Sequence, residues 1–214
     1  MTDKASPLLV FGGTFDPPHL AHVELPRRAA ELISAKRIIY VPAAQSPHKT
    51  TAPTPAEHRV AMLRIALRHI SNAEISMIEL DRAGPSYMVE TLHALRGQVH
   101  SDTPMRLLIG ADQAVAFHRW HRWQEIISLA EPLIMLRPPW DRERLQDELA
   151  RHHGPDSANA WMSWVIDLPL VDVAATTLRE HFLRSKDAEP VDIDPEVARY
   201  IRQHRLYDSA GELD

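Results

Sequence analysis

Two histidines three positions apart, His19 and His22, follow a glycine-rich turn near the start of the chain. The surrounding stretch reads VFGGTFDPPHLAH, and a helix that begins there would carry both imidazoles on one face of its first turn. Glycines at a strand-to-helix turn let backbone N–H groups approach an anion closely, and the helix N-terminus adds partial positive charge. Histidines above such a site indicate chemistry on a phosphate group.

The same turn could be a plain strand-to-helix connection with both histidines exposed to solvent. Against that interpretation, two glycines, a hydroxyl and a carboxylate stand within a dozen residues of the histidines. The combination favours a phosphate-binding turn. Its candidate phosphate contacts are Gly12, Gly13, Thr14, Phe15 and Asp16.

The composition excludes several other kinds of chemistry. The chain has no cysteine, which excludes disulfides, thiolate nucleophiles and zinc sites with cysteine ligands. A formal net charge of −5 argues against a broad nucleic-acid surface, so local basic residues must hold any anion. No apolar run is long enough for a signal sequence or a membrane span. We therefore expect a cytoplasmic protein without nucleic-acid or membrane partners.

The elements that must position the turn alternate along the chain. Short aliphatic runs predict strands at Leu8–Phe11, Arg37–Val41, Glu74–Leu80, Arg106–Ile109, Leu133–Leu136 and Trp164–Leu168. Amphipathic runs predict helices at Leu20–Ile33, Pro55–His69, Tyr87–Arg96, Gln124–Leu129, Arg142–His152, Thr177–Arg184 and Pro195–Gln203. This alternation predicts an α/β fold: a doubly wound, Rossmann-like, mostly parallel sheet with helices on both faces. We expect one domain over 1–208, with a C-terminal helical part at about 176–208 and a disordered tail at 209–214.

Several local signals refine these elements. Thr54 and Asp194 each precede a proline that suits a first helical turn, so both are predicted N-caps. Pro26 predicts a kink in the first helix or a late start to it. The segments Pro42–Pro55 and His153–Ala160 are predicted to be loops.

Further polar residues are expected where ligands of such sheets bind, beyond the carboxyl ends of the strands. Gly110 and Asp112 follow one strand; the carboxylate could accept hydrogen bonds from ribose hydroxyls or serve as an ordinary N-cap. Arg137 stands at the end of another strand. Its side chain could make a second contact to the anion or form a salt bridge at the rim of the site. Arg179 follows Thr176 in the expected first turn of a helix, where an arginine opposes the macrodipole unless an anion accompanies it.

Five separated segments resemble those of the bacterial nicotinate-nucleotide adenylyltransferases, nucleotidyltransferases of NAD synthesis. They read GGTFDPPHLAH, QSPHK, PSYMVETL, LLIGADQAVAFHRWHRW and ATTLR, in the expected order. The resemblance implies transfer of the adenylyl group of ATP, with Mg²⁺, to the phosphate of nicotinate mononucleotide. The products would be deamido-NAD and pyrophosphate. It also implies four catalytic residues, namely His19, His22, Lys49 and Arg179.

That reaction needs positioning and charge neutralisation, because the attacking phosphate is already an anion and requires no general base. His22 is the candidate for stabilising the transition state at the α-phosphate. Lys49 is expected to contact phosphate, although an exposed lysine is ordinarily just solvated. Asp16 could orient the turn or a metal-bound water. The resemblance places the aromatic residue that stacks on the pyridine ring at Trp120 and leaves Trp123 to packing.

Three positions depart from the family pattern. Ala21 replaces a glycine between the two histidines, and Val173–Ala175 lacks the serine usual before Thr176. Met88 stands where a threonine is common near the pyridine carboxylate, which weakens the case for a strict preference for the acid over the amide. Backbone N–H groups near Met88 and His121 could still hold that carboxylate.

Other interpretations remain open from the sequence. Another nucleotidyltransferase, such as a phosphopantetheine adenylyltransferase or a cytidylyltransferase, would share the phosphate half of the site. A non-catalytic nucleotide sensor would not need all four catalytic residues. A nucleic-acid binder using HRWHRW conflicts with the net charge. A homo-oligomer is compatible with the sequence, and the histidines show no spacing typical of a protein metal site.

Overall fold

A computed structural model describes residues 6–44, 53–82, 84, 86–169, 171–184 and 192–208. Within these residues, six parallel strands form one sheet in the order β3-β2-β1-β4-β5-β6. The strands are β1 (Leu8–Gly13), β2 (Arg37–Pro42), β3 (Ala73–Ile75), β4 (Met105–Gly110), β5 (Glu131–Met135) and β6 (Val165–Ile166). The order reverses direction between β1 and β4, where doubly wound sheets bind their ligands. The predicted Rossmann-like parallel sheet is confirmed.

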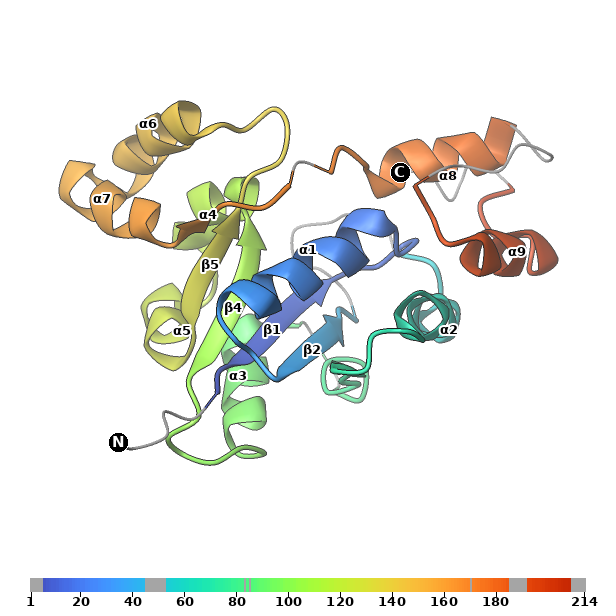
Figure 1. Ribbon diagram of the computed structural model, residues 1–214, viewed down its shortest axis with the longest axis horizontal. Coiled ribbons are helices and arrows are strands. Elements are labelled where there is room, and N and C mark those ends of the chain that lie inside the picture. Colours follow the sequence, from blue (N-terminus) through green and yellow to red (C-terminus); the bar gives the residue numbers. More distant parts are fainter. Residues whose placement is uncertain are drawn as a thin grey trace.

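Helices cover both faces of the sheet (Figure 1). They are α1 (Leu20–Leu32), α2 (Ala56–Leu67), α3 (Met88–Arg96), α4 (Ala111–Ala116), α5 (Trp123–Leu129), α6 (Arg142–His153), α7 (Pro155–Ser163), α8 (Ala175–Arg184) and α9 (Pro195–Gln203). A short 3₁₀ helix, Phe117–Arg119, follows α4. None of the helices in the described ranges is long and apolar enough to cross a membrane.

The residues of β1 show how the two cores are divided. Leu8 and Val10 pack with side chains from α3, whereas Leu9 and Phe11 pack beneath α1. All four are buried, because side chains alternate between faces and both faces of a parallel sheet are covered. The central strand therefore delivers the glycine-rich turn from a rigid base.

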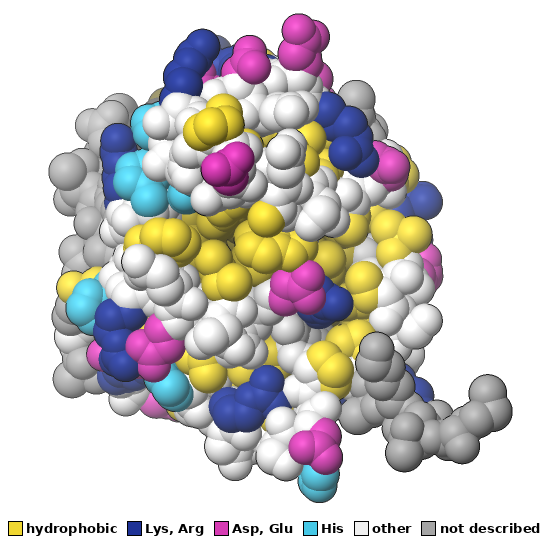
Figure 2. Space-filling view, turned by 90° about the vertical axis from the view of Figure 1, so that its left-hand side faces the viewer, with side chains coloured by type: hydrophobic (Ala, Val, Ile, Leu, Met, Phe, Trp, Pro, Cys, Tyr) yellow, Lys and Arg dark blue, Asp and Glu magenta, His cyan; other side chains and the backbone are white. Residues whose placement is uncertain are grey.

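The half of the molecule that carries α5, α6 and α7 leaves some apolar surface open. Hydrophobic side chains gather in a band across the face seen in Figure 2, with charged side chains around it. Trp123 and Trp164 pack on the core of this half while staying partly exposed.

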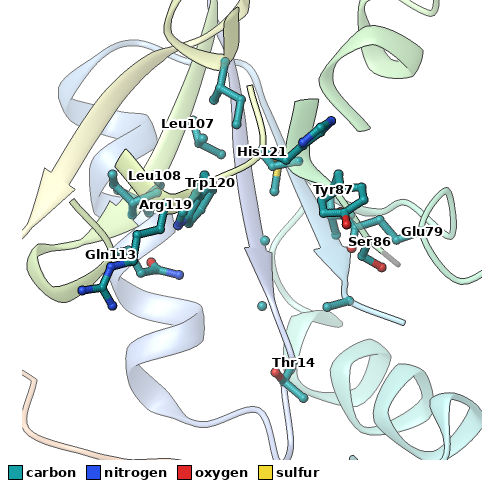
Figure 3. Close-up of a pocket in the computed structure, with 17 residues that line it drawn as sticks. Thr14, Glu79, Ser86, Tyr87, Leu107, Leu108, Gln113, Arg119, Trp120 and His121 are labelled. Atoms are coloured by element: carbon teal, nitrogen blue, oxygen red, sulfur yellow. The ribbon is translucent and has the colours of Figure 1, made fainter. Parts of the chain in front are cut away.

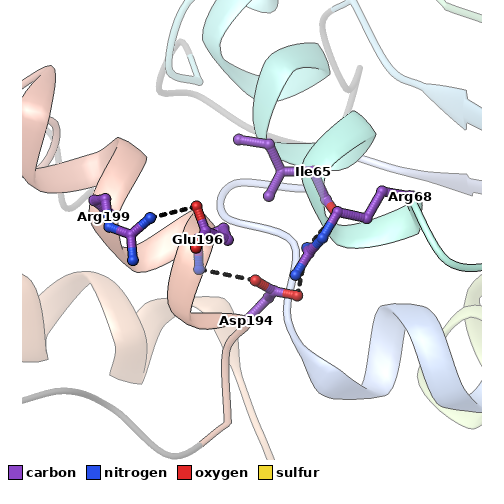
Figure 4. Close-up of polar contacts among 5 residues, drawn as sticks. All are labelled: Ile65, Arg68, Asp194, Glu196 and Arg199. Carbon is purple, nitrogen blue, oxygen red and sulfur yellow. Dashed lines mark hydrogen bonds and ion pairs between the residues drawn. The ribbon is translucent and has the colours of Figure 1, made fainter.

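Helices α8 and α9 form a small apolar cluster with α2 at the opposite side of the molecule (Figure 1). Val197 and Ile201 of α9 pack there with Met62 of α2, and all three are buried. At the edge of the cluster, the carboxylate of Asp194 pairs with Arg68 at 2.6 Å, as Figure 4 shows. This polar contact fixes the start of α9 against the end of α2, while the buried apolar side chains supply most of the stabilisation.

Two predicted segments differ from the structure. β3 is an edge strand that pairs with β2 through Ala73–Ile75, so the predicted strand Glu74–Leu80 was too long and was placed too late. The predicted loop His153–Ala160 is wrong, because Pro155 opens helix α7. Proline is favoured at a first helical position, and burial of Trp161 against the core holds the helix in place. The sequence lacks the wide apolar stripe that would have predicted it.

The predicted helix ends are confirmed in part. Asp194 caps α9, where its side chain accepts a hydrogen bond from the backbone N–H of Glu196 at 2.8 Å. Thr54 does not cap α2: Pro55 occupies the N-cap position, and the Thr54 backbone N–H donates to Asp16 instead. α1 begins at Leu20 and continues through Pro26, so the predicted late start is wrong. Residues 45–52, within the predicted loop, and the predicted tail at 209–214 lie outside the described residues.

Candidate active site

The glycine-rich turn leaves the end of β1 in an unusual backbone conformation. Phe15 adopts a left-handed φ of 53°, and the Asp16–Pro17 peptide bond is cis. Phe15 is nonetheless buried, and its ring lies edge-on to those of Phe11 and His22. A Cβ atom on Gly12 would lie 2.8 Å from the terminal methyl of Met88, so this glycine leaves room for that side chain. The turn is thus packed closely below and open toward the cavity above.

His19 and His22 form a stacked pair at the start of α1. Their ring centroids are 3.7 Å apart with an interplanar angle of 29°. The backbone N–H of His19, the N-cap residue, donates to Nδ1 of His22 at 3.3 Å. An acceptor role at Nδ1 leaves the proton of a neutral imidazole on Nε2, so His22 keeps an N–H donor for a ligand. Nδ1 of His19 is buried with no hydrogen-bond partner among the described residues.

Both imidazoles are neutral near pH 7 when no anion is bound. Burial lowers the pKa of His19 to about 4, and Arg137 adds to the shift. Burial also holds the pKa of His22 well below its usual range, with contributions from His19 and Arg137. A neutral pair attracts phosphate through N–H dipoles, and the arriving negative charge favours its protonation.

Arg137 and Asp112 lie at the same edge of the sheet. The guanidinium of Arg137 is 3.2 Å from both carboxylate oxygens of Asp112. Gly110, not Asp112, is the N-cap of α4, so the N-cap interpretation of Asp112 is wrong. About half of each side chain is exposed, which leaves both accessible to a ligand. The predicted rim salt bridge is therefore present, and the positive charge of Arg137 also lowers the pKa of both histidines.

Asp16 is buried beneath the turn rather than pointing toward the cavity. Its Oδ1 accepts a hydrogen bond from the hydroxyl of Tyr207 at 2.6 Å, and its Oδ2 accepts from the Thr54 N–H at 3.0 Å. Of the two predicted roles for Asp16, these contacts favour orienting the turn.

Arg179 meets the turn from α8. Its guanidinium donates to the backbone carbonyl of Asp16 at 2.9 Å and to the Thr176 hydroxyl at 3.4 Å. Because α8 begins at Ala175, Arg179 lies just beyond the first helical turn, so the predicted first-turn position was wrong. Both of these acceptors are neutral, so the positive charge of Arg179 stays available to an anion.

A cavity of about 370 Å³ opens beside the turn. In Figure 3, Trp120 lies near its middle, Tyr87 and His121 lie to one side, and Thr14 lies at the far end. The Trp120 ring stacks on Phe117, with centroids 4.7 Å apart and planes 22° apart. Trp123 packs instead near the ring of His153, as expected for a packing residue.

The start of α3 also faces this cavity. Met88 is the first residue of the helix and lines the cavity together with Ser86 and Tyr87. Tyr87, the N-cap, makes no side-chain cap, and a helix gives its first N–H groups no internal acceptor. The candidate site thus combines the glycine-rich turn, the rings of Trp120 and Tyr87 (the aromatic shelf) and the N-terminus of α3.

Residues 10–188 match the model of the cytidylyltransferase-like family. The chain is 33% identical over 202 residues to a probable nicotinate-nucleotide adenylyltransferase of Hydrogenovibrio crunogenus, covering 92% of this chain and 95% of the relative. It is 37% identical over 199 residues to the corresponding protein of Symbiobacterium thermophilum, covering 92% and 93%. The chain belongs to the nicotinate-nucleotide adenylyltransferase family. The resemblance read from the five sequence segments is confirmed.

A solved adenylyltransferase shares the fold of this family member. Plasmodium falciparum nicotinic acid mononucleotide adenylyltransferase, complexed with NaAD, superposes with a TM-score of 0.73. The match covers 95% of this chain and 98% of that chain at 18% sequence identity. The sheet order and the helices on both faces are thus those of the adenylyltransferase fold.

Two buried polar residues beside the candidate site were not predicted from the sequence. Arg59 of α2 is fully buried, and it donates to the backbone carbonyls of Thr14 at 2.8 Å and Thr54 at 2.7 Å. Its position three and four residues before buried Met62 and Leu63 was the available signal, since these residues share one helix face.

The second residue is Glu79, which is buried and lines the cavity. It accepts a hydrogen bond from the Thr91 hydroxyl at 2.7 Å, and burial raises its pKa. The sequence analysis placed Glu79 inside a predicted strand that was too long, so it was not recognised as a residue that lines the cavity. Lys49, the fourth predicted catalytic residue, lies outside the described residues.

Proposed function

We propose that this protein transfers the adenylyl group of ATP to the phosphate of nicotinate mononucleotide, forming deamido-NAD and pyrophosphate. The observation that carries the proposal is the shared cavity. Gly12, Gly13 and Thr14 of the turn line the same space as Trp120 and Tyr87. A phosphate site and an aromatic site in one cavity can hold two nucleotides with their phosphates facing each other. The family's named relatives support this choice over other nucleotidyltransferase reactions.

The reaction is an in-line displacement at the α-phosphorus of ATP. An oxygen of the mononucleotide phosphate forms the new bond, and the bond to the bridging oxygen of the β-phosphate breaks, with its electron pair leaving on pyrophosphate. No proton must be removed from the nucleophile. Catalysis therefore rests on alignment and on donors aimed at the charge of the five-coordinate phosphorus.

The polar side chains around the turn are assigned roles in that step. We assign the Nε2–H of His22 to a non-bridging oxygen of the α-phosphate, because its Nδ1 is already engaged as an acceptor. His19, Arg179 and Lys49 are assigned to the triphosphate, with backbone N–H groups of the turn. Asp112 is assigned to a ribose hydroxyl of ATP and Arg137 to its phosphates, because both side chains remain partly exposed at the sheet edge.

The family reaction uses a divalent metal, which we propose is Mg²⁺ bound to the phosphates of ATP as part of the substrate. Among the described residues, no group of three or more histidine or acidic side chains could hold a metal ion. The two carboxylate oxygens of Asp16 are engaged by Tyr207 and Thr54. Mg²⁺ that keeps its waters and binds through substrate phosphates fits these surroundings and neutralises part of their charge.

The start of α3 supports a preference for the acid over the amide form of the pyridine. A carboxylate on the ring can accept from the first N–H groups of the helix and gains from its partial positive charge. Met88 supplies no hydroxyl, so these backbone groups, with those near His121, carry the recognition. An uncharged carboxamide gains less from the same donors. We therefore infer that nicotinate mononucleotide is the preferred substrate.

The deciding experiment is a pyrophosphate-release assay with ATP, Mg²⁺ and either pyridine mononucleotide. We expect release with both and a higher kcat/KM for the nicotinate form. Absence of release with either nucleotide would overturn the proposed reaction. Equal kcat/KM values would overturn the role given to the start of α3.

Trp120→Ala is expected to raise the KM for the pyridine mononucleotide about tenfold, because base–aromatic stacking contributes about 1–3 kcal/mol. The KM for ATP should change little, since Thr14 of the glycine-rich turn lies at the far end of the cavity from Trp120. Steady-state kinetics with each substrate varied in turn measures both constants. Trp120→Phe keeps a stacking ring and serves as the matched control. Equal increases in the two KM values would make Trp120 a packing residue.

A further inference from the structure

Tyr207 links the end of the described chain to the phosphate-binding turn. Its side chain is fully buried, and its hydroxyl donates to Oδ1 of Asp16, which lies 191 positions earlier in the chain. Burial and the nearby carboxylate raise the pKa of Tyr207, so the hydroxyl stays protonated as a donor. Its ring belongs to the apolar cluster that α8 and α9 form with α2. Tyr207 therefore joins that cluster directly to the turn.

The turn depends on such outside contacts for its shape. Phe15 holds a left-handed backbone conformation, which is unfavourable for a residue with a bulky side chain. The carbonyls on either side of it, at Thr14 and Asp16, accept hydrogen bonds from Arg59 of α2 and Arg179 of α8. Groups from α2, from α8 and from the residues after α9 thus hold a turn of few residues. A buried network of this kind fixes one conformation when its members are satisfied.

Asp16 connects these contacts to the side chains that we assign to the triphosphate. Two prolines separate it from His19, and their fixed φ angles leave little freedom between the two residues. The carbonyl of Asp16 also fixes the guanidinium of Arg179. A shift of Asp16 would therefore move the histidine pair and the arginine together. Trp120 and Tyr87 belong to other segments and would stay in place.

We propose that Tyr207 is a positioning residue for adenylyl transfer, which holds Asp16 and, through it, the triphosphate half of the site. The proposal rests on the proposed function for its kinetic readout. It assigns a role in the reaction to a side chain that touches neither substrate. The C-terminal helical part thereby becomes a brace for the N-terminal turn.

The test compares Tyr207→Phe with Tyr200→Phe. Tyr200 belongs to the same C-terminal part, and its hydroxyl also has a hydrogen-bond partner, Nδ1 of His58 at 2.9 Å. Each variant removes one phenol hydroxyl and keeps the ring. We expect Tyr207→Phe to lower kcat/KM for ATP at least tenfold while the KM for the mononucleotide changes less than twofold. Tyr200→Phe is expected to behave as wild type in both measurements.

Direct titration of MgATP by calorimetry separates this proposal from the proposed function. Weaker ATP binding by Tyr207→Phe than by Tyr200→Phe supports the brace even if the wild-type protein releases no pyrophosphate. Equal ATP affinity and equal kinetics in the two variants would overturn it. If Tyr207→Phe does not fold, Asp16→Ala is used, because it removes both carboxylate oxygens, including the one that accepts from the Tyr207 hydroxyl. Wild-type ATP affinity and kinetics in Asp16→Ala would then overturn the proposal.

Discussion

His22→Ala is expected to lower kcat by about 10²–10³-fold, the usual effect of removing one donor that faces developing charge. His22 contributes an N–H at Nε2 because its Nδ1 accepts from the backbone of His19. Alanine removes that donor together with the acceptor that the His19 backbone N–H uses at the start of α1. Binding of the pyridine mononucleotide should persist, since the aromatic shelf does not involve this side chain. Pyrophosphate-release kinetics and mononucleotide titration measure the two effects.

Two further variants make the result specific. His22→Gln places an amide N–H near the position of Nε2 and should retain part of the activity lost in His22→Ala. His69→Ala, at an exposed position after α2, should retain wild-type kcat. A wild-type kcat in His22→Ala would contradict the proposed role of His22 in stabilising the transition state.

The sequence could predict that the residues of the candidate phosphate half lie together, because its signals are local. Glycines, hydroxyl, carboxylate and histidines stand close together in the chain, and a strand-to-helix turn brings them to one place. Alternating apolar runs also predicted the sheet, since parallel strands buried on both faces leave a nearly continuous apolar pattern. The signals for the pyridine half of the site are spread along the chain. Trp120 was predicted only from the family resemblance, and Glu79 was not predicted.

The role of Asp16 could not be decided from its neighbours in the sequence. Its position in the turn is compatible with orienting the loop or a metal-bound water. The contact that favours one role comes from Tyr207, and no pattern in the sequence relates the two residues. Arg59 is similar, because its importance lies in two carbonyls that it reaches only after α2 packs against the turn. Long-range hydrogen bonds of buried polar groups are set by the tertiary fold.

Acidification below about pH 6.5 is expected to destabilise the unliganded protein. The pKa of His19 is about 4 in the folded protein, against 6.5 for a free histidine. Between these pH values the unfolded chain binds a proton at this site and the folded protein does not. Stability is therefore fully present above pH 6.5 and falls as the pH drops toward 4. The loss from this one group amounts to about 3 kcal/mol in the free energy of unfolding.

His22 adds to the loss in the same direction, because burial lowers its pKa as well. Urea unfolding at several pH values between 7.5 and 4.5 measures the effect, with the double variant His19→Gln/His22→Gln as control. The variant should show a shallower decline, since other groups with lowered pKa, such as His153, are present in both proteins and cancel in the comparison. If the free energy of unfolding declined equally with pH in both proteins, the fold would not be holding the stacked histidine pair neutral. MgATP should flatten the decline of the wild-type protein, because bound phosphate stabilises the protonated imidazoles that the empty site disfavours.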